Sequence, residues 1–155
     1  MTEPTDAGGG PALDRRSRLA RFLQNAAMIL AAPSLFYGVL GVGSTLIVWS
    51  MIELDLARPD FYMSLFAAAG ASSYLVYLLR RHRALHEGRS APGRRLPLVL
   101  NTACIACAIY VGVTRAEMLA NPLLLAIILL LIVGPATSCA ALLVGSPAAG
   151  ARRAA

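Results

Sequence analysis

The clearest candidates for chemistry are basic side chains at the end of a long apolar stretch. Arg80, Arg81 and Arg83 stand within four residues of one another, with His82 among them. Guanidinium groups pair with phosphate through two parallel hydrogen bonds, so this cluster could hold the phosphate of a lipid headgroup. Arginines at such a place are also typical of a membrane helix that ends at the cytoplasmic side. The sequence leaves both interpretations open.

Few other residues could carry chemistry. Cys104 and Cys107 form a C-x-x-C, but no second cysteine pair and no neighbouring acid or histidine completes a metal site. His82 and His86 fall in a basic, turn-rich stretch that the sequence assigns to a loop. No nucleophile triad or nucleotide-binding motif occurs. We therefore expect no disulfide, no metal, no cofactor and no enzyme activity.

Composition and charge spacing define the elements that must position these residues. Hydrophobic residues make up 57% of the 155-residue chain and charged residues only 14%, against about 25% in soluble domains. Four windows, 22–52, 61–79, 96–114 and 118–150, contain no Asp, Glu, Lys, Arg or His, and each is long enough to span a bilayer. The prediction is an all-α polytopic membrane protein of four transmembrane helices in two hairpins, with spans at about 34–52, 61–79, 96–114 and 122–145.

Local signals set the expected boundaries. A Gly-rich tail, 1–13, is expected to be disordered, and 14–30 reads as a short amphipathic helix at the membrane surface that ends or kinks at Pro33. Asn121 and Pro122 are a typical helix start, with Asn as the N-cap. The transmembrane domain covers 14–150, and 151–155 form a C-terminal tail.

Arginine positions predict the orientation. All 14 basic residues are Arg, and only Arg58 and Arg115 fall in the loops between the first and second and between the third and fourth spans. The positive-inside rule then places both termini and the middle loop in the cytoplasm. We expect a multi-pass protein of the cell inner membrane that contacts lipids and does not bind nucleic acid, despite its net charge of +6.

Small and polar residues inside the spans are candidates for helix packing or for a groove. Small side chains let helices approach closely in lipid, and Asn, Ser and Thr hydrogen-bond between helices. Asn101 could bond a neighbouring helix or face a groove. Pro135 removes a backbone hydrogen bond, and Thr137, Ser138 and Cys139 could satisfy the freed carbonyl. The candidates are Gly41, Ser44, Thr45, Gly70, Ser72, Ser73, Asn101, Gly134 and Pro135.

Several of these patterns resemble the GtrA-like family of four-span membrane proteins. The run from Tyr37 to Leu46 (YGVLGVGSTL) is similar to the family's first span. Pro59, the small-residue stretch 67–73 and the exit 74–83 (YLVYLLRRHR) follow its second, and Gly134-Pro135 fits its fourth. Ser73-Tyr74 and Ser138-Cys139 stand where the family has Asn-Phe.

The resemblance implies a role with polyprenyl-phosphate-linked sugars in cell-envelope polysaccharide synthesis. The chain would flip the lipid-linked sugar across the membrane or assist a glycosyltransferase partner. Four helices are thin for enclosing a sugar, so a homo-oligomer is expected. The residues alone leave a second hypothesis open, in which the chain anchors or assembles an enzyme complex and transports nothing. A pore-forming role is less favoured, because no polar stripe lines any span.

Overall fold

The computed structural model describes residues 10–52, 59–90 and 92–144, and this part of the chain is helical apart from its connections. The elements are α1 (Gly10–Ile52), α2 (Pro59–His86), α3 (Arg95–Thr114), a short 3-10 helix η1 (Ala116–Ala120) and α4 (Pro122–Val144). Each α-helix contains a stretch long and apolar enough to cross a bilayer, namely Ser17–Ile47, Phe61–His86, Arg95–Thr114 and Pro122–Val144. These four helices indicate a multi-pass membrane protein, as the uncharged windows predicted.

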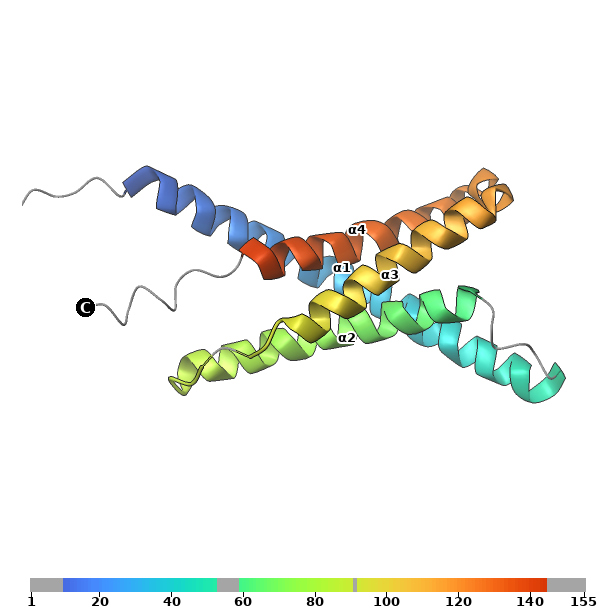
Figure 1. Ribbon diagram of the computed structural model, residues 1–155, viewed down its shortest axis with the longest axis horizontal. Coiled ribbons are helices and arrows are strands. Elements are labelled where there is room, and N and C mark those ends of the chain that lie inside the picture. The colour runs from blue at the N-terminus through green and yellow to red at the C-terminus, as the bar shows by residue number, and fades with distance from the viewer. Residues whose placement is uncertain (1–9, 53–58, 91, 145–155) are drawn as a thin grey trace, which may run out of the picture.

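The four helices pack as a ring in which each contacts the next along the chain and α4 returns to α1 (Figure 1). Helices α2 and α4 also meet across the middle of the bundle. The contacts of α2 with α3, and of α1 with α4, are as extensive as those of α3 with α4, although α1 and α2 share the most extensive contact. The structure therefore does not set two hairpins apart.

One end of the bundle collects most of the arginines. Helices α1 and α3 begin there and α2 and α4 end there, at the left of Figure 1. We call this the Arg-rich end and the opposite one the far end. The arginines at the Arg-rich end whose side chains the structure describes are Arg15, Arg18, Arg21, Arg80, Arg81, Arg83, Arg89, Arg94 and Arg95. Arg115 lies at the far end, after α3.

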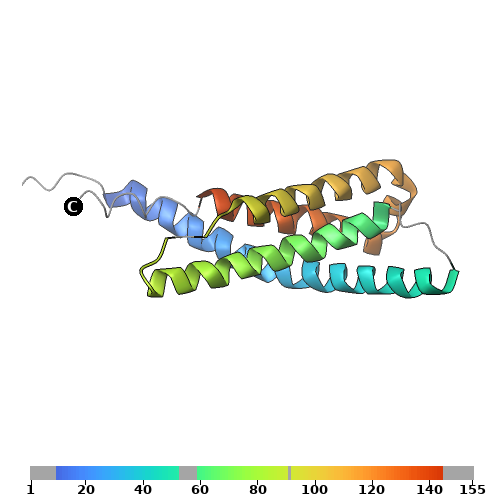
Figure 2. The ribbon, with the colours of Figure 1, turned by 60° about the horizontal axis from the view of Figure 1, so that its bottom comes forward.

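Helix α1 is longer than predicted and does not end at Pro33. It runs for 43 residues with Pro33 in its interior, so no separate amphipathic helix precedes a span starting at residue 34. Proline removes one N–H and crowds one carbonyl, which bends a helix more often than it ends one in membranes. Figure 2 shows α1 changing direction between its blue and cyan parts. Residues 10–13 of the predicted tail belong to this helix, whereas 1–9 and 145–155 lie outside the described residues.

The other helix boundaries follow local signals. The Asn121 side chain accepts a hydrogen bond from the Leu123 N–H at 3.0 Å, which confirms the predicted N-cap with Pro122 as the first helical residue. Helix α2 continues past residue 79 through the basic cluster and ends at His86, and Gly88 in the following turn has φ +65°. The Arg89 N–H then bonds the Ala84 carbonyl at 2.9 Å, as in a Schellman motif.

Small residues make up much of the bundle's interior. A buried cluster in its Arg-rich half consists of Ala27, Ala31, Ala71, Tyr74, Tyr77, Ala141 and Leu142. A second cluster, in the far half, consists of Met63, Ala67, Cys104, Ala108, Val111 and Leu131. Lipid is as apolar as these side chains, so close van der Waals contact rather than escape from water holds the helices together.

Helices α1 and α2 approach each other closely at two glycines of α1. A Cβ added at Gly38 would lie 2.8 Å from both Cα and Cβ of Ala68, and one at Gly41 would lie 2.7 Å from the Cβ of Ser64. Real Cβ atoms do not approach other atoms this closely. Glycine at these positions is therefore a condition for the observed packing. This agrees with the prediction that Gly41 is a packing residue.

We expect Gly38→Ala to lower the free energy of unfolding by about 1–3 kcal/mol, the usual cost of overpacking. Gly43→Ala is the matched control on the same helix, because a Cβ there meets no atom within 4 Å. That control is expected to be neutral or to stabilise by up to about 1 kcal/mol through its helix propensity. Unfolding in detergent, followed by circular dichroism, measures both variants. Equal stability of the two would contradict the close approach.

Candidate functional site

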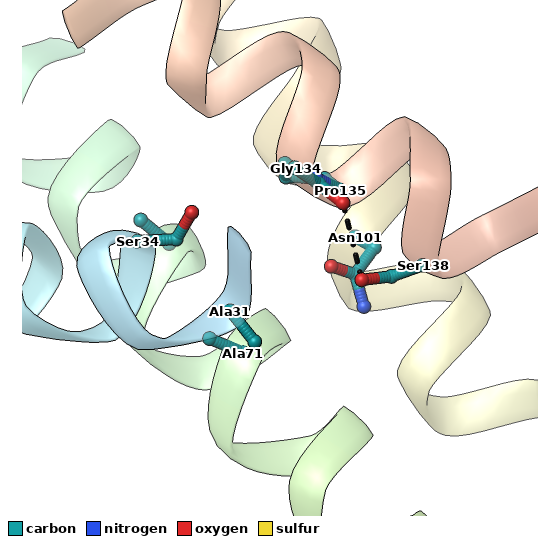
Figure 3. A pocket seen from close by; sticks show the side chains of 8 residues that line it. Ala31, Ser34, Ala71, Asn101, Gly134, Pro135 and Ser138 are labelled. Atoms are coloured by element: carbon teal, nitrogen blue, oxygen red, sulfur yellow. Dashed lines mark hydrogen bonds between the residues drawn. The ribbon is translucent and has the colours of Figure 1, made fainter. Parts of the chain in front are cut away.

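All four helices meet around a small polar cavity at the centre of the bundle (Figure 3). Its volume is about 10 Å³, which is close to the space that one water molecule needs. A sugar does not fit in it. The lining residues are Ala31 and Ser34 of α1, Ala67 and Ala71 of α2, Asn101 of α3, and Gly134, Pro135 and Ser138 of α4.

Asn101 joins α3 to α2 at this cavity. Its side chain is 2% exposed, and its Nδ2 donates to the Pro97 carbonyl at 2.7 Å and to the Gly70 carbonyl at 3.3 Å. A Cβ at Gly70 would lie 3.2 Å from the Asn101 Oδ1, so glycine gives the amide room. Of the two predicted roles, the bond to a neighbouring helix is confirmed. The cavity beside the amide is too small to be the predicted groove.

Pro135 has no N–H for the Leu131 carbonyl, and a side chain from another helix takes its place. The Cys104 thiol of α3 donates to the Leu131 oxygen at 3.7 Å, and Cys104 is fully buried. Thr137 and Ser138 instead bond the Gly134 carbonyl, at 2.7 Å and 3.1 Å. The prediction that the residues after Pro135 satisfy its freed carbonyl is therefore wrong, and the role of Cys104 was missed.

Gly134 is a point of contact between α4 and α1. A Cβ at this position would lie 3.0 Å from the Ser34 Oγ, which itself donates to the Leu30 carbonyl at 2.9 Å. Figure 3 shows Ser34 on α1 and the Gly134–Pro135 pair on α4 on opposite sides of the cavity. Gly134 and Pro135 thus lie in the packed centre of the bundle.

The remaining small polar candidates bond their own helices. Ser44 and Thr45 donate to the Gly41 carbonyl at 3.1 Å and 2.8 Å, and Ser73 donates to the Gly70 carbonyl at 2.8 Å. Ser72 is exposed on the outside of α2. These hydroxyl groups do not converge on a common site. They reduce the polarity that the helices present to lipid.

The structure divides the predicted arginine cluster. Arg80 and Arg83 are exposed and lie three residues apart on α2, so they share one face. Arg81 is half-buried and lies on the side of α2 that carries the buried Tyr74 and Tyr77. Arg80 and Arg83 can therefore reach a lipid phosphate together, whereas Arg81 lies on another side of the helix.

Arg94 has a structural contact that the sequence did not suggest. Its Nη1 donates to the Leu142 carbonyl at 3.0 Å, near the end of α4. The last four carbonyls of a helix have no partner within it, and a cation stabilises the negative end of the helix dipole. This bond ties the start of α3 to the end of α4.

An apolar groove between α2 and α3 opens on the outer surface near the far end. Its volume is about 520 Å³. Three aromatic rings form much of its wall, and Tyr62 and Tyr110 are 42% and 59% exposed. In the sequence, Tyr62 and Phe66 are four residues apart, and so are Ala106 and Tyr110. Nothing in the sequence indicated that these two pairs face each other across a groove. Its lining is Pro59, Tyr62, Phe66, Ala106, Cys107 and Tyr110.

Comparison of the chain with protein-family models, with curated proteins and with solved structures found no match.

We expect Cys104→Ala and Pro135→Ala to be coupled. Pro135→Ala restores an N–H for the Leu131 carbonyl, so the loss of the thiol should then cost about 0.5–1 kcal/mol less than in the original chain. Unfolding of the two single variants and the double variant in detergent measures the coupling. Cys107→Ala, which deletes a thiol with no bond to that carbonyl, should be insensitive to Pro135→Ala. Additive effects of Cys104→Ala and Pro135→Ala would argue against the thiol–carbonyl bond.

A second prediction concerns Tyr74, whose side chain is 1% exposed. Its hydroxyl has no hydrogen-bond partner among the residues that the structure describes. Tyr74→Phe removes this group and keeps the ring, so we expect the free energy of unfolding to rise by about 1 kcal/mol. Tyr110→Phe, at an exposed ring, should leave it unchanged. A loss of stability in Tyr74→Phe would reveal a partner for the hydroxyl.

Proposed function

We propose that this protein binds a polyprenyl-phosphate-linked sugar along α2 and α3 and helps to move it across the cell inner membrane. The proposal follows the resemblance to GtrA-like proteins. Its main structural support is that α2 carries two features that such a ligand needs. Exposed Arg80 and Arg83 lie at one end, and an apolar groove lies near the other.

The phosphate fits the Arg-rich end. A guanidinium pair on one helix face can hold a phosphate through several charge-assisted hydrogen bonds. We place this end in the cytoplasm, since the positive-inside rule favours arginines on that side. Both termini then lie on the cytoplasmic side, where the lipid-linked sugar would be made.

The prenyl chain fits the groove. Phe66 in the groove and Arg80 are 14 positions apart on α2, which corresponds to roughly 20 Å of helix. One leaflet contributes only about half of the ~30 Å hydrocarbon core, so a chain that joins both features extends beyond a leaflet. A long polyprenyl chain meets this requirement better than an ordinary acyl chain.

The sugar needs a route that one chain does not supply. The central cavity of about 10 Å³ is too small for it, and the lipid-facing sides of the helices are apolar. We therefore propose that a homo-oligomer, or a complex with a glycosyltransferase, completes the path between subunits. The closed centre also favours the second candidate function, in which the protein anchors or assembles an enzyme complex without transport.

Native mass spectrometry in detergent tests lipid binding directly. The purified protein is mixed with polyprenyl phosphate and with an anionic diacyl phospholipid. We expect preferential retention of the polyprenyl lipid, reduced at least about tenfold in Arg80→Gln/Arg83→Gln, because charge-assisted bonds to phosphate contribute about 1.5–3 kcal/mol each. Arg115→Gln, at the far end, is the control and should bind normally.

A second pair of variants tests the groove. Ala106→Trp fills it and should weaken binding of polyprenyl phosphate more than binding of the diacyl lipid. Leu129→Trp adds the same ring on the exposed face of α4 and serves as the control. Equal retention of the two lipids by the original chain would reject the proposed ligand and favour the assembly role.

A further inference from the structure

We propose that His82 and His86 form a binding site for a divalent transition-metal ion such as Zn²⁺ at the Arg-rich end of α2. The two imidazoles are four residues apart on one helix, and their ring centroids are 4.5 Å apart with an angle of 81° between the planes. Both side chains are exposed. The site is separate from the proposed lipid site and does not depend on it.

The spacing is what the chemistry requires. Residues four positions apart on a helix lie one above the other, so rotation about the side-chain bonds can bring one nitrogen of each ring to a common ion. Imidazole is a preferred ligand of Zn²⁺, Cu²⁺ and Ni²⁺, and two histidines at this spacing supply part of the zinc site in helical metalloproteases. The rings already lie in contact, so little conformational freedom is lost on binding.

The surroundings define the kind of site. No third His, Cys, Asp or Glu joins the pair in the part of the chain that the structure describes. Two imidazoles leave the remaining coordination positions to water or to an anion such as phosphate. This arrangement suits an exchangeable ion, since closed four-ligand shells are typical of structural zinc sites.

Charge acts on this site in two directions. Helix α2 ends at His86, so this residue lies in the last turn beside the negative end of the helix dipole, which favours a cation. The positive charge of Arg83 repels a bound cation, because among the arginines of α2 this side chain projects closest to the direction of His82 and His86. At 100° per residue, Arg80 and Arg81 project from other sides of α2. The exposed positions screen this repulsion through water and salt.

The sequence alone could not suggest the pair. Gly88, Pro92 and Gly93 predict a loop, in which His82 and His86 have no fixed relation. Two further helical turns after residue 79 bring them onto one face. The expectation that the chain binds no metal rested on the incomplete set of ligands around Cys104 and Cys107 and on the assignment of both histidines to a loop.

Nuclear magnetic resonance with histidine-selective isotope labelling tests the site, because His82 and His86 are the only histidines in the sequence. The full chain, purified without a polyhistidine tag, is titrated with Zn²⁺ in detergent. We expect the imidazole signals of both residues to shift together and saturate at one equivalent. In His82→Gln or His86→Gln only one imidazole remains to bind the ion. The affinity of the remaining histidine for Zn²⁺ should then fall at least about tenfold, since the chelate is lost.

A composition-matched variant, His82→Leu/Leu85→His, keeps two histidines but places them at adjacent positions, where the rings diverge. Leu85 is 73% exposed, so the exchange leaves the core intact, and circular dichroism checks the helix content. This variant should bind Zn²⁺ as weakly as the single variants. Independent shifts of the two signals, or equal affinity in the exchanged variant, would overturn the proposal.

Discussion

A carbonyl oxygen inside a bilayer has no water to bond, so each must find a partner within the protein. Much of this structure answers that constraint. Pro135 withdraws the partner of the Leu131 carbonyl, and the Cys104 thiol of α3 approaches that oxygen. Near the end of α4, Arg94 bonds the Leu142 carbonyl. At these two carbonyls a side chain from a neighbouring helix supplies the missing hydrogen bond, and the two bonds become contacts that help to fix how α3 and α4 pack.

The need to satisfy carbonyl groups also requires the helices to pack closely. A thiol or an amide reaches a carbonyl of the next helix only when the two backbones are near each other, which glycine permits at Gly70 beside Asn101. Most other hydroxyl groups bond their own helix, as Thr45 does with the Gly41 carbonyl. The bundle therefore keeps few polar groups in its centre. The cavity that they share is about as large as one water molecule.

The spans could be predicted from the sequence because a charged side chain in lipid is costly, so long stretches without charged residues indicate membrane-spanning segments. Asn121 and Pro122 predicted the start of α4 because capping is local. Of the two effects predicted for Pro33, an end or a kink, the end did not occur, since one lost hydrogen bond does not outweigh the rest of a long apolar helix. Arg81 projects from another side of α2 than Arg80 and Arg83 because successive helical residues are rotated by 100°. The sequence did not show this, since the helix was expected to end at residue 79 and it extends to His86.

The site was harder to predict because its partners are distant in sequence. Asn101 was a correct candidate, but its bond to the Gly70 carbonyl spans 31 positions. The sequence excluded Cys104 from a metal site but gave it no partner, and only the position of α4 shows which carbonyl its thiol meets. The groove joins Phe66 to Tyr110 across two helices. Such contacts depend on how the helices cross, and the residue pattern along a single helix does not predict the crossing.

The uncharged interior has a consequence for how the membrane acts on this protein. A potential of 100 mV exchanges about 2.3 kcal/mol with each elementary charge that crosses the bilayer. The four uncharged windows hold no Asp, Glu, Lys, Arg or His, so a shift of one helix against another carries no formal charge through the hydrocarbon layer. Voltage thus does little work on the bundle. The apolar stretch of α1, Ser17–Ile47, has 31 residues and is roughly 46 Å long as a helix, which exceeds the ~30 Å hydrocarbon core. Helix α1 therefore has to tilt or bend to match the bilayer, and bilayer thickness acts on the bundle through this helix.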